Sequence, residues 1–182
     1  MAARLAAFAA AGTPIFFMAG NRDFLLGADY ARRARLTLLP DPSVVDLYGI
    51  PTLLMHGDSL CTEDLAYQRF RAVARRPWVQ GGFRALPLAL RKAIARRLRK
   101  ASRQAQGRKP MAAMDVTPAA VETALQAADC ARLIHGHTHR PARHGLILRG
   151  QACERWVLPD WDARTGWLSC DAAACALNYL EV

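Results

Sequence analysis

Short apolar runs that end in glycine and polar residues recur along the chain, and each one predicts a buried strand. Three of these runs lead within a few residues to a candidate ligand, which is Asn21, His56 or His137. In α/β proteins, the residues that follow the carboxyl ends of strands form the ligand sites. The pattern therefore predicts a mixed α/β (α+β) fold with a binding site assembled from three separate parts of the chain.

The rest of the apolar pattern predicts helices and shorter strands. Helices are predicted at 1–11, 28–34, 64–73, 88–105 and 118–128. Strands are predicted at 15–18, 36–39, 44–48, 52–55, 133–134, 145–148, 154–158, 167–170 and 176–180. The segment 75–87 contains two prolines and two glycines and is predicted to be a broken connection. Thr117 is predicted to cap the helix at 118–128.

Length and composition indicate a globular protein. The 182 residues contain no internal repeat or linker and are predicted to form a single domain. No apolar stretch approaches the roughly 20 residues that span a bilayer. Five cysteines, an odd number without a Cys-x-x-Cys pair, predict reduced thiols in a cytosolic protein.

The positive charge is concentrated in one segment. The formal net charge is +10, and 14 of the 25 Lys and Arg residues lie between Arg69 and Lys109. Residues 65–114 contain no Asp or Glu. A surface of one sign favours an anionic partner, which the charge alone leaves open among phosphorylated substrates, acidic lipids and nucleic acid.

The basic segment is also amphipathic. Leu90, Ile94 and Leu98 repeat at helical spacing, with basic residues elsewhere on the same helix. Trp78 and Phe83 lie in the connection before it. A helical insertion at about 64–110 with these properties could lie on anionic membrane lipids. The alternative is that its apolar stripe packs on the domain and its arginines are solvated.

The histidine-rich stretch 133–141 is the main candidate for a metal site. His137 and His139 are two residues apart, so in an extended segment they face the same way and are expected to converge. Neutral imidazole is a common metal ligand. His135 precedes Gly136 and is interpreted as a supporting residue.

Two earlier polar clusters offer further candidates. The amide oxygen of Asn21 can bind a metal, and the guanidinium of Arg22 can bind phosphate. Asp23 is a candidate either for the site or for a helix cap. His56 follows a second buried strand, and Asp58 is a candidate either to orient a ligand histidine or to cap the next segment.

These clusters, in this order, resemble the motifs of a known family. Gly20–Asp23, Met55–Asp58 and Gly136–His139 resemble the motifs of calcineurin-like metallophosphoesterases. The arginine at position 22 resembles one branch of that family, whose members hydrolyse UDP-2,3-diacylglucosamine in lipid A biosynthesis. Further matches to this branch lie at 21–27, 56–62, 114–116, 135–141 and 157–161.

The resemblance implies a β-sandwich flanked by helices and a dinuclear Mn²⁺ centre. It implies hydrolysis of a pyrophosphate bond, giving UMP and 2,3-diacylglucosamine 1-phosphate. By the same resemblance, Asn21, His56 and His137 would bind one ion and His139 the other, while Asn21, Arg22 and His137 would act in catalysis. The implied substrate contacts are Asn21, Arg22, Asp64, Ser102, Gln106, Lys109 and His137.

The resemblance also implies a cellular location. The basic insertion would receive the acyl chains of a membrane-borne substrate. The protein is then expected in the cytoplasm, peripheral on the inner face of the inner membrane, and no nucleic-acid partner is expected.

One difference from the family pattern affects the expected activity. The family's strand with Asp-x-His and its next strand ending in Gly-Asp supply the remaining ligands of the first ion and a bridging carboxylate. Neither motif precedes the helix at 1–11. We therefore expect a domain that is incomplete at its N-terminus, with one Mn²⁺ ion or none, weak metal affinity and little hydrolysis. The alternatives are a non-catalytic, basic anion- or membrane-binding module and another nucleotide pyrophosphatase.

Overall fold

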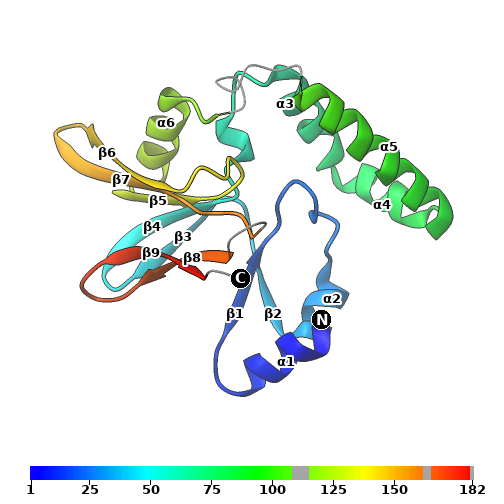
Figure 1. The fold of residues 1–182 in the computed structure, drawn as a ribbon, viewed down its shortest axis with the longest axis horizontal. Coiled ribbons are helices and arrows are strands. Elements are labelled where there is room, and N and C mark those ends of the chain that lie inside the picture. The colour runs from blue at the N-terminus through cyan, green and yellow to red at the C-terminus, as the bar shows by residue number, and fades with distance from the viewer. Residues whose placement is uncertain (108–114, 162–164, 181–182) are drawn as a thin grey trace.

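The protein has a mixed α/β fold in which a five-stranded sheet is flanked by helices, and this confirms the expected fold class. Figure 1 shows the computed structural model, which describes residues 1–107, 115–161 and 165–180. The described strands form three sheets, one of five strands and two of two strands.

The first part of the chain forms a small α/β unit. Its helices are α1 (Ala2–Ala10) and α2 (Ala28–Ala34), and its strands are β1 (Ile15–Met18) and β2 (Leu36–Leu39). The two strands are parallel, and both helices contact β2. In Figure 1 this unit projects away from the five-stranded sheet, and its described strands pair only with each other.

The central sheet places three strand ends at one edge. Its order is β3-β4-β5-β7-β6, and β4, β5 and β7 are mutually parallel. The bounds of its strands are β3 (Ser43–Leu47), β4 (Ile50–Met55), β5 (Arg132–His135), β6 (Ala142–Leu148) and β7 (Gln151–Val157). Because the carboxyl ends of parallel strands meet at the same edge, the loops that follow β4, β5 and β7 lie close together.

Helix α6 (Pro118–Ala128) covers one face of this sheet. Val121 and Leu125 are one helical turn apart and pack against Leu53 of β4 and Leu133 of β5. Thr117 occupies the N-cap position, but its side chain does not cap the helix, which corrects the prediction. Its hydroxyl instead donates to the carbonyl of Leu60 and is 2.8 Å from the hydroxyl of Thr62.

The basic insertion contains one more helix than predicted. The short 3₁₀ helix η1 (Asp58–Leu60) precedes the insertion, which contains α3 (Leu65–Ala74), α4 (Pro77–Ala85) and α5 (Leu88–Gln106). The prediction of a broken connection at 75–87 was therefore wrong for α4. Proline is tolerated in the first helical turn, and each glycine costs only about 1 kcal/mol relative to alanine. Packing of the half-buried Val79 and Phe83 offsets that cost.

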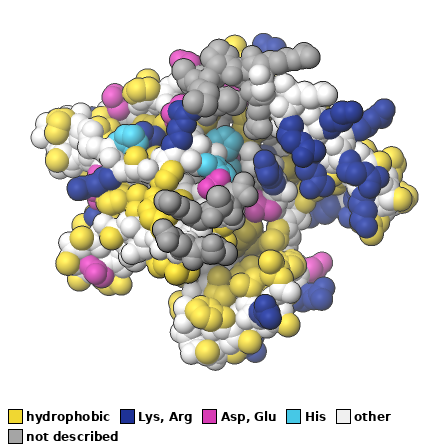
Figure 2. Space-filling model, in the orientation of Figure 1, with side chains coloured by type: hydrophobic (Ala, Val, Ile, Leu, Met, Phe, Trp, Pro, Cys, Tyr) yellow, Lys and Arg dark blue, Asp and Glu magenta, His cyan; other side chains and the backbone are white. Residues whose placement is uncertain are grey.

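The insertion also displays most of the basic side chains on the visible face of the molecule. Figure 2 shows the Lys and Arg side chains gathered over α3–α5. None of the described helices combines the length and the apolar character that crossing a membrane requires.

The C-terminal hairpin is formed by β8 (Thr165–Cys170) and β9 (Cys175–Leu180). Cys170 and Cys175 face each other across the hairpin and form a disulfide. The prediction that all five cysteines are reduced was therefore wrong for this pair, because the hairpin register brings two cysteines together without a Cys-x-x-Cys motif. Cys61, Cys130 and Cys153 are buried thiols outside this disulfide.

Candidate functional site

Three loops bring Asn21, His56 and His137 together at the carboxyl edge of the strands. The backbone amide of Asn21 donates to Nε2 of His56 at 3.2 Å. The side-chain amide of Asn21 lies 3.5 Å from Nδ1 of His137. The rings of His56 and His137 meet edge to face, with centroids 5.1 Å apart. We call these three residues the central cluster.

The loop after β5 turns sharply instead of continuing as an extended strand. The strand ends at His135, and His137 and His139 both have positive φ angles, 69° and 53°. The amide of Thr138 donates to the carbonyl of Gly136 at 2.8 Å, which closes a γ-turn around His137. The extended backbone on which the predicted convergence of His137 and His139 was based is therefore not present in this loop, although His139 lies close enough to His137 to lower its pKa.

His139 contacts a side chain of the loop that follows β7. Its Nδ1 lies 3.1 Å from Oδ2 of Asp160, in the loop after β7, and both side chains are about half exposed. Sequence reasoning placed Asp160 in a matching segment and gave it no role. His139 thus has a carboxylate neighbour, and it also lies close enough to His137 of the central cluster to lower the pKa of that residue.

Two glycines allow the histidine loops to approach one another. Gly20 is buried, and a Cβ atom there would lie 2.8 Å from Cε1 of His56. Gly57 has φ +107°, and a Cβ atom there would lie 2.8 Å from Nδ1 of His135. Any larger residue at either position would push the histidine loops apart.

His135 is completely buried beneath the loop that carries His137. Its Nδ1 is 2.8 Å from the carbonyl of Gly136, and its Nε2 is 3.2 Å from Nη1 of Arg155. A carbonyl only accepts and a guanidinium only donates, so the proton of the neutral ring is on Nδ1. Burial lowers the pKa of His135 to about 4, which agrees with this neutral form.

The two histidines of the central cluster are also held in the neutral form. Burial, with a smaller contribution from nearby His56, lowers the pKa of His137 to about 4. Burial also lowers the pKa of His56, although the carboxylates of Asp58 and Asp41 oppose this effect. Neutral imidazole is the form that binds metal ions.

A buried ionic network joins the central cluster to α3. Asp58 has no exposed surface, and its Oδ2 lies 2.6 Å from the hydroxyl of Tyr67, 3.0 Å from Nε of Arg71 and 3.3 Å from Nη2 of Arg75. Burial raises the pKa of Asp58, but the Tyr67 hydrogen bond and the two arginines outweigh it, so the pKa lies below its usual value. From its sequence, Asp58 was a candidate to orient a ligand histidine or to cap the next segment, and the network gives it neither role.

The network extends to the backbone of the cluster itself. The amide of His56 donates to Asp41 at 3.1 Å, and Arg71 and Arg75 lie 3.6 and 3.8 Å from the same carboxylate. Arg75 also donates to the carbonyl of Gly20 at 3.5 Å. Sequence reasoning missed this network, although the spacing of Arg71 and Arg75 places both on one face of a helix.

The remaining predicted site residues are in the turn after β1 and in the insertion. Arg22 is exposed in the turn after β1 and makes no side-chain hydrogen bond within the described residues. Asp64 is the N-cap of α3 and accepts from the amide of Tyr67 at 3.0 Å. Ser102 is exposed on α5. The side chain of Gln106 and all of Lys109 lie outside the described residues.

The central cluster fits part of a single metal site. One amide and two neutral imidazoles are suitable donors for a divalent transition metal. Among residues 1–107, 115–161 and 165–180, no group of three or more His, Cys, Asp or Glu side chains is placed to hold an ion. The described residues therefore offer three donors for one ion, with His139 and Asp160 as a separate pair.

Comparison with known proteins finds relatives that share one name. No protein-family model matches the chain. It is 50% identical over 189 residues to a protein of Xanthomonas axonopodis pv. citri (strain 306), covering 100% of this chain and 76% of that protein. It is 53% identical over 167 residues to a protein of Pseudomonas paraeruginosa (strain DSM 24068 / PA7), covering 92% and 69%. Both relatives are named UDP-2,3-diacylglucosamine hydrolase. The chain therefore belongs to the family of UDP-2,3-diacylglucosamine hydrolases.

Proposed function

We propose that the protein hydrolyses the pyrophosphate bond of UDP-2,3-diacylglucosamine to UMP and 2,3-diacylglucosamine 1-phosphate in lipid A biosynthesis. Family membership over the whole chain supports this reaction. The structural observation that carries it is the convergence of Asn21, His56 and His137 from three separate loops. Neutral nitrogen and amide donors beside an exposed arginine suit an anionic, metal-assisted phosphate reaction.

We propose Mn²⁺ as the metal, bound by Asn21, His56 and His137. A bound divalent cation would neutralise phosphate charge and lower the pKa of a water molecule. His139 would contribute to a second ion together with its neighbour Asp160. With three donors in the central cluster, we expect weak Mn²⁺ binding, so the metal concentration should limit the rate of hydrolysis.

The remaining roles belong to the chain's own residues. Arg22 is exposed in the same turn as Asn21, and its guanidinium would bind the pyrophosphate oxygens in bidentate fashion. The γ-turn around His137 would hold this side chain in position against the substrate. From the insertion, Asp64, Ser102, Gln106 and Lys109 would contact the sugar phosphate.

We propose that the insertion binds the anionic inner face of the inner membrane and receives the acyl chains there. It exposes several large apolar side chains, including Phe70 at 43%, Trp78 at 69% and Leu88 at 56%. The same helices carry many arginines, and Figure 2 shows Lys and Arg side chains gathered over this part of the molecule. Apolar side chains in a basic surface suit binding to anionic lipids.

The reaction is tested by measuring UMP release from UDP-2,3-diacylglucosamine over a range of Mn²⁺ concentrations. We expect Asn21→Ala and His137→Ala to lower the rate at least tenfold and to raise the Mn²⁺ requirement. The matched control is Asn178→Ala, because Asn178 lies in the β8–β9 hairpin. This variant should leave the rate and the Mn²⁺ requirement unchanged. No UMP release at any Mn²⁺ concentration, or equal effects of Asn21→Ala and Asn178→Ala, would contradict the proposal.

Membrane binding is tested separately by sedimentation with vesicles. We expect stronger binding to vesicles with anionic lipid than to neutral ones, and weaker binding after Trp78→Ser. Trp161→Ser is the control, because Trp161 is 75% exposed but lies outside the insertion. Equal binding to both vesicle types would exclude the membrane role.

A further inference from the structure

A pocket of about 260 Å³ lies at the carboxyl end of β7, on the face of the sheet that α6 covers. Arg155 and His144 are partners on the adjacent strands β7 and β6, and both line it. Thr138, Arg140 and Asp115 form other parts of its wall. Neither the relatives' names nor the candidate site assigns a role to this pocket.

The wall of the pocket contains a half-buried cation, Arg155, that forms no ion pair within the described residues, although Asp115 acts on its pKa from a longer distance. Arg155 donates to the neutral His135 ring at 3.2 Å, and within the described residues no carboxylate pairs with it. Asp115 also lines the pocket, but its Oδ2 is 2.6 Å from Nη1 of Arg140 and its Oδ1 accepts from the amide of Val116. Partial burial of an unpaired charge is unfavourable, so an anionic ligand would stabilise this arrangement.

The hydrogen bond to His135 also orients the guanidinium of Arg155. It occupies one nitrogen of the guanidinium and fixes the plane of the group. The other N–H groups then remain for a ligand in the pocket, and a guanidinium fork suits phosphate oxygens. His144 lies beside Arg155 and adds another nitrogen donor.

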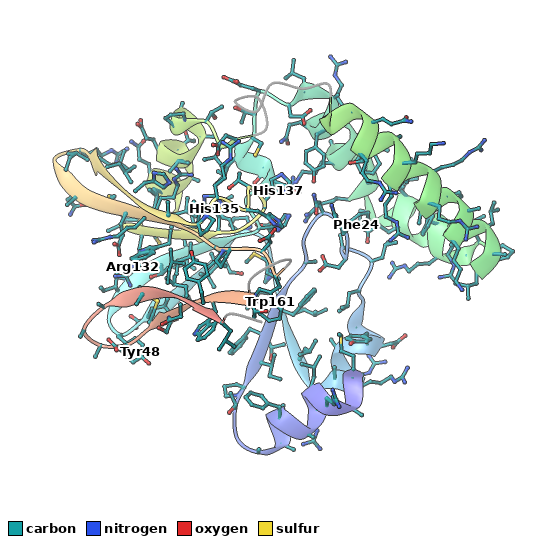
Figure 3. The ribbon with its side chains drawn as sticks, viewed as in Figure 1. Phe24, Tyr48, Arg132, His135, His137 and Trp161 are labelled. Atoms are coloured by element: carbon teal, nitrogen blue, oxygen red, sulfur yellow. A yellow bond between two sulfur atoms is a disulfide. The ribbon has the colours of Figure 1, made fainter. Side chains whose placement is uncertain are left out.

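The position of the pocket relates it to the reaction. Thr138 lines the pocket and directly follows His137, so the pocket begins one residue from the central cluster. In Figure 3, His137 lies between α6 with β6–β7 on one side and the α3–α5 insertion on the other. The exposed apolar side chains that suit acyl chains are on the insertion, away from this pocket.

We propose that this pocket binds the nucleotide half of the substrate, and the nucleoside 5′-monophosphate product, with the phosphate against Arg155 and the loop that carries His137. The inference rests on the proposed function for the identity of the nucleotide. The pocket is slightly smaller than the roughly 300–1,000 Å³ typical of ligand sites, and its size and polar lining suit a phosphate and ribose.

The test is calorimetric titration of the whole chain with UMP, uridine and glucosamine 1-phosphate. We expect UMP to bind at least tenfold more tightly than uridine, and Arg155→Met to weaken UMP binding about tenfold or more. Arg143→Met is the matched control. Arg143 lies on β6, pairs with Glu154 and stacks on Trp156. The substitution therefore removes the same positive charge at a position outside the pocket. It should change UMP binding less than twofold.

Arg155→Lys is the second variant, with circular dichroism of each protein as the check of folding. It keeps the charge and should retain more UMP affinity than Arg155→Met. The inference is overturned if both methionine variants weaken UMP binding equally, if uridine binds as tightly as UMP, or if Arg155→Met weakens glucosamine 1-phosphate as much as UMP. Loss of UMP binding in Arg155→Met, together with no hydrolysis by the wild type, would contradict only the proposed function.

Discussion

The hydroxyl of Tyr67 on α3 donates a hydrogen bond of 2.6 Å to the completely buried carboxylate of Asp58, two residues after His56. The Tyr67 ring also lies near the ring of His137, with centroids 5.8 Å apart. One side chain of the insertion therefore contacts two of the loops that form the central cluster. The geometry of the cluster depends on the packing of α3 as well as on the sheet.

Tyr67→Phe should destabilise the protein by about 1.5–3 kcal/mol, because it removes a hydrogen bond to a buried, charged acceptor. Tyr48→Phe is the matched control, since Tyr48 is 62% exposed and should change stability by less than about 0.5 kcal/mol. The measurement is the free energy of unfolding in urea. Equal values for the two variants would show that the Tyr67–Asp58 contact adds nothing to stability.

Arg75→Lys should lower kcat for UMP release by about tenfold to a hundredfold while changing KM little. Arg75 contacts Asp58, Asp41 and the carbonyl of Gly20, and one ammonium group cannot reproduce this set of contacts. We interpret Arg75 as a positioning residue that acts through the loops carrying Asn21 and His56.

The control for this prediction is Arg76→Lys, since Arg76 is the exposed neighbour on the same turn. It should leave kcat within twofold of the wild type. The positioning role would be refuted by a change in KM alone, or by a similar loss of kcat in both variants.

Gly57→Ala should destabilise the protein by at least about 2 kcal/mol. The position has φ +107°, and the new methyl group would lie 2.8 Å from Nδ1 of His135. Gly145→Ala is the control, because an added Cβ there meets no atom within 4 Å. Thermal unfolding of the two variants gives the comparison, and an unchanged midpoint in Gly57→Ala would contradict the close packing described for this loop.

The pH dependence of stability should include a contribution from Glu154. Burial raises its pKa, but Arg132, with Nε at 2.5 Å, and Arg143, with Nε at 2.8 Å, outweigh this effect, so the pKa lies below its usual value. A carboxyl with a lowered folded pKa stabilises the fold above its unfolded pKa of about 4.3, and this contribution is lost as pH falls through the folded pKa.

Glu154→Gln should therefore be less stable than the wild type at pH 7, and the difference should shrink towards pH 3. Unfolding free energies measured across this range give the result. Glu122→Gln, on the exposed face of α6, should follow the wild type throughout. A constant difference between Glu154→Gln and the wild type would mean that ionisation of Glu154 does not contribute.

Local patterns in the sequence were sufficient to predict most elements and the candidate ligands. The helices at 28–34 and 118–128 have the predicted bounds, because their apolar spacing and end signals are local properties. Asn21, His56 and His137 were predicted from strands that end in polar residues, and the structure brings these three together. Helix α4 was missed because tertiary packing overrode the local glycine and proline signals.

Tertiary structure alone decided which side chains meet. The loop after β5 places His139 beside Asp160, a contact that depends on the strand order β4-β5-β7. The hairpin register joins Cys170 to Cys175. The sequence by itself determined most of the helices and strands and the donors at their ends, since these follow from spacing along the chain. The partners of those donors depend on sheet order and loop geometry, which bring together residues far apart in the sequence.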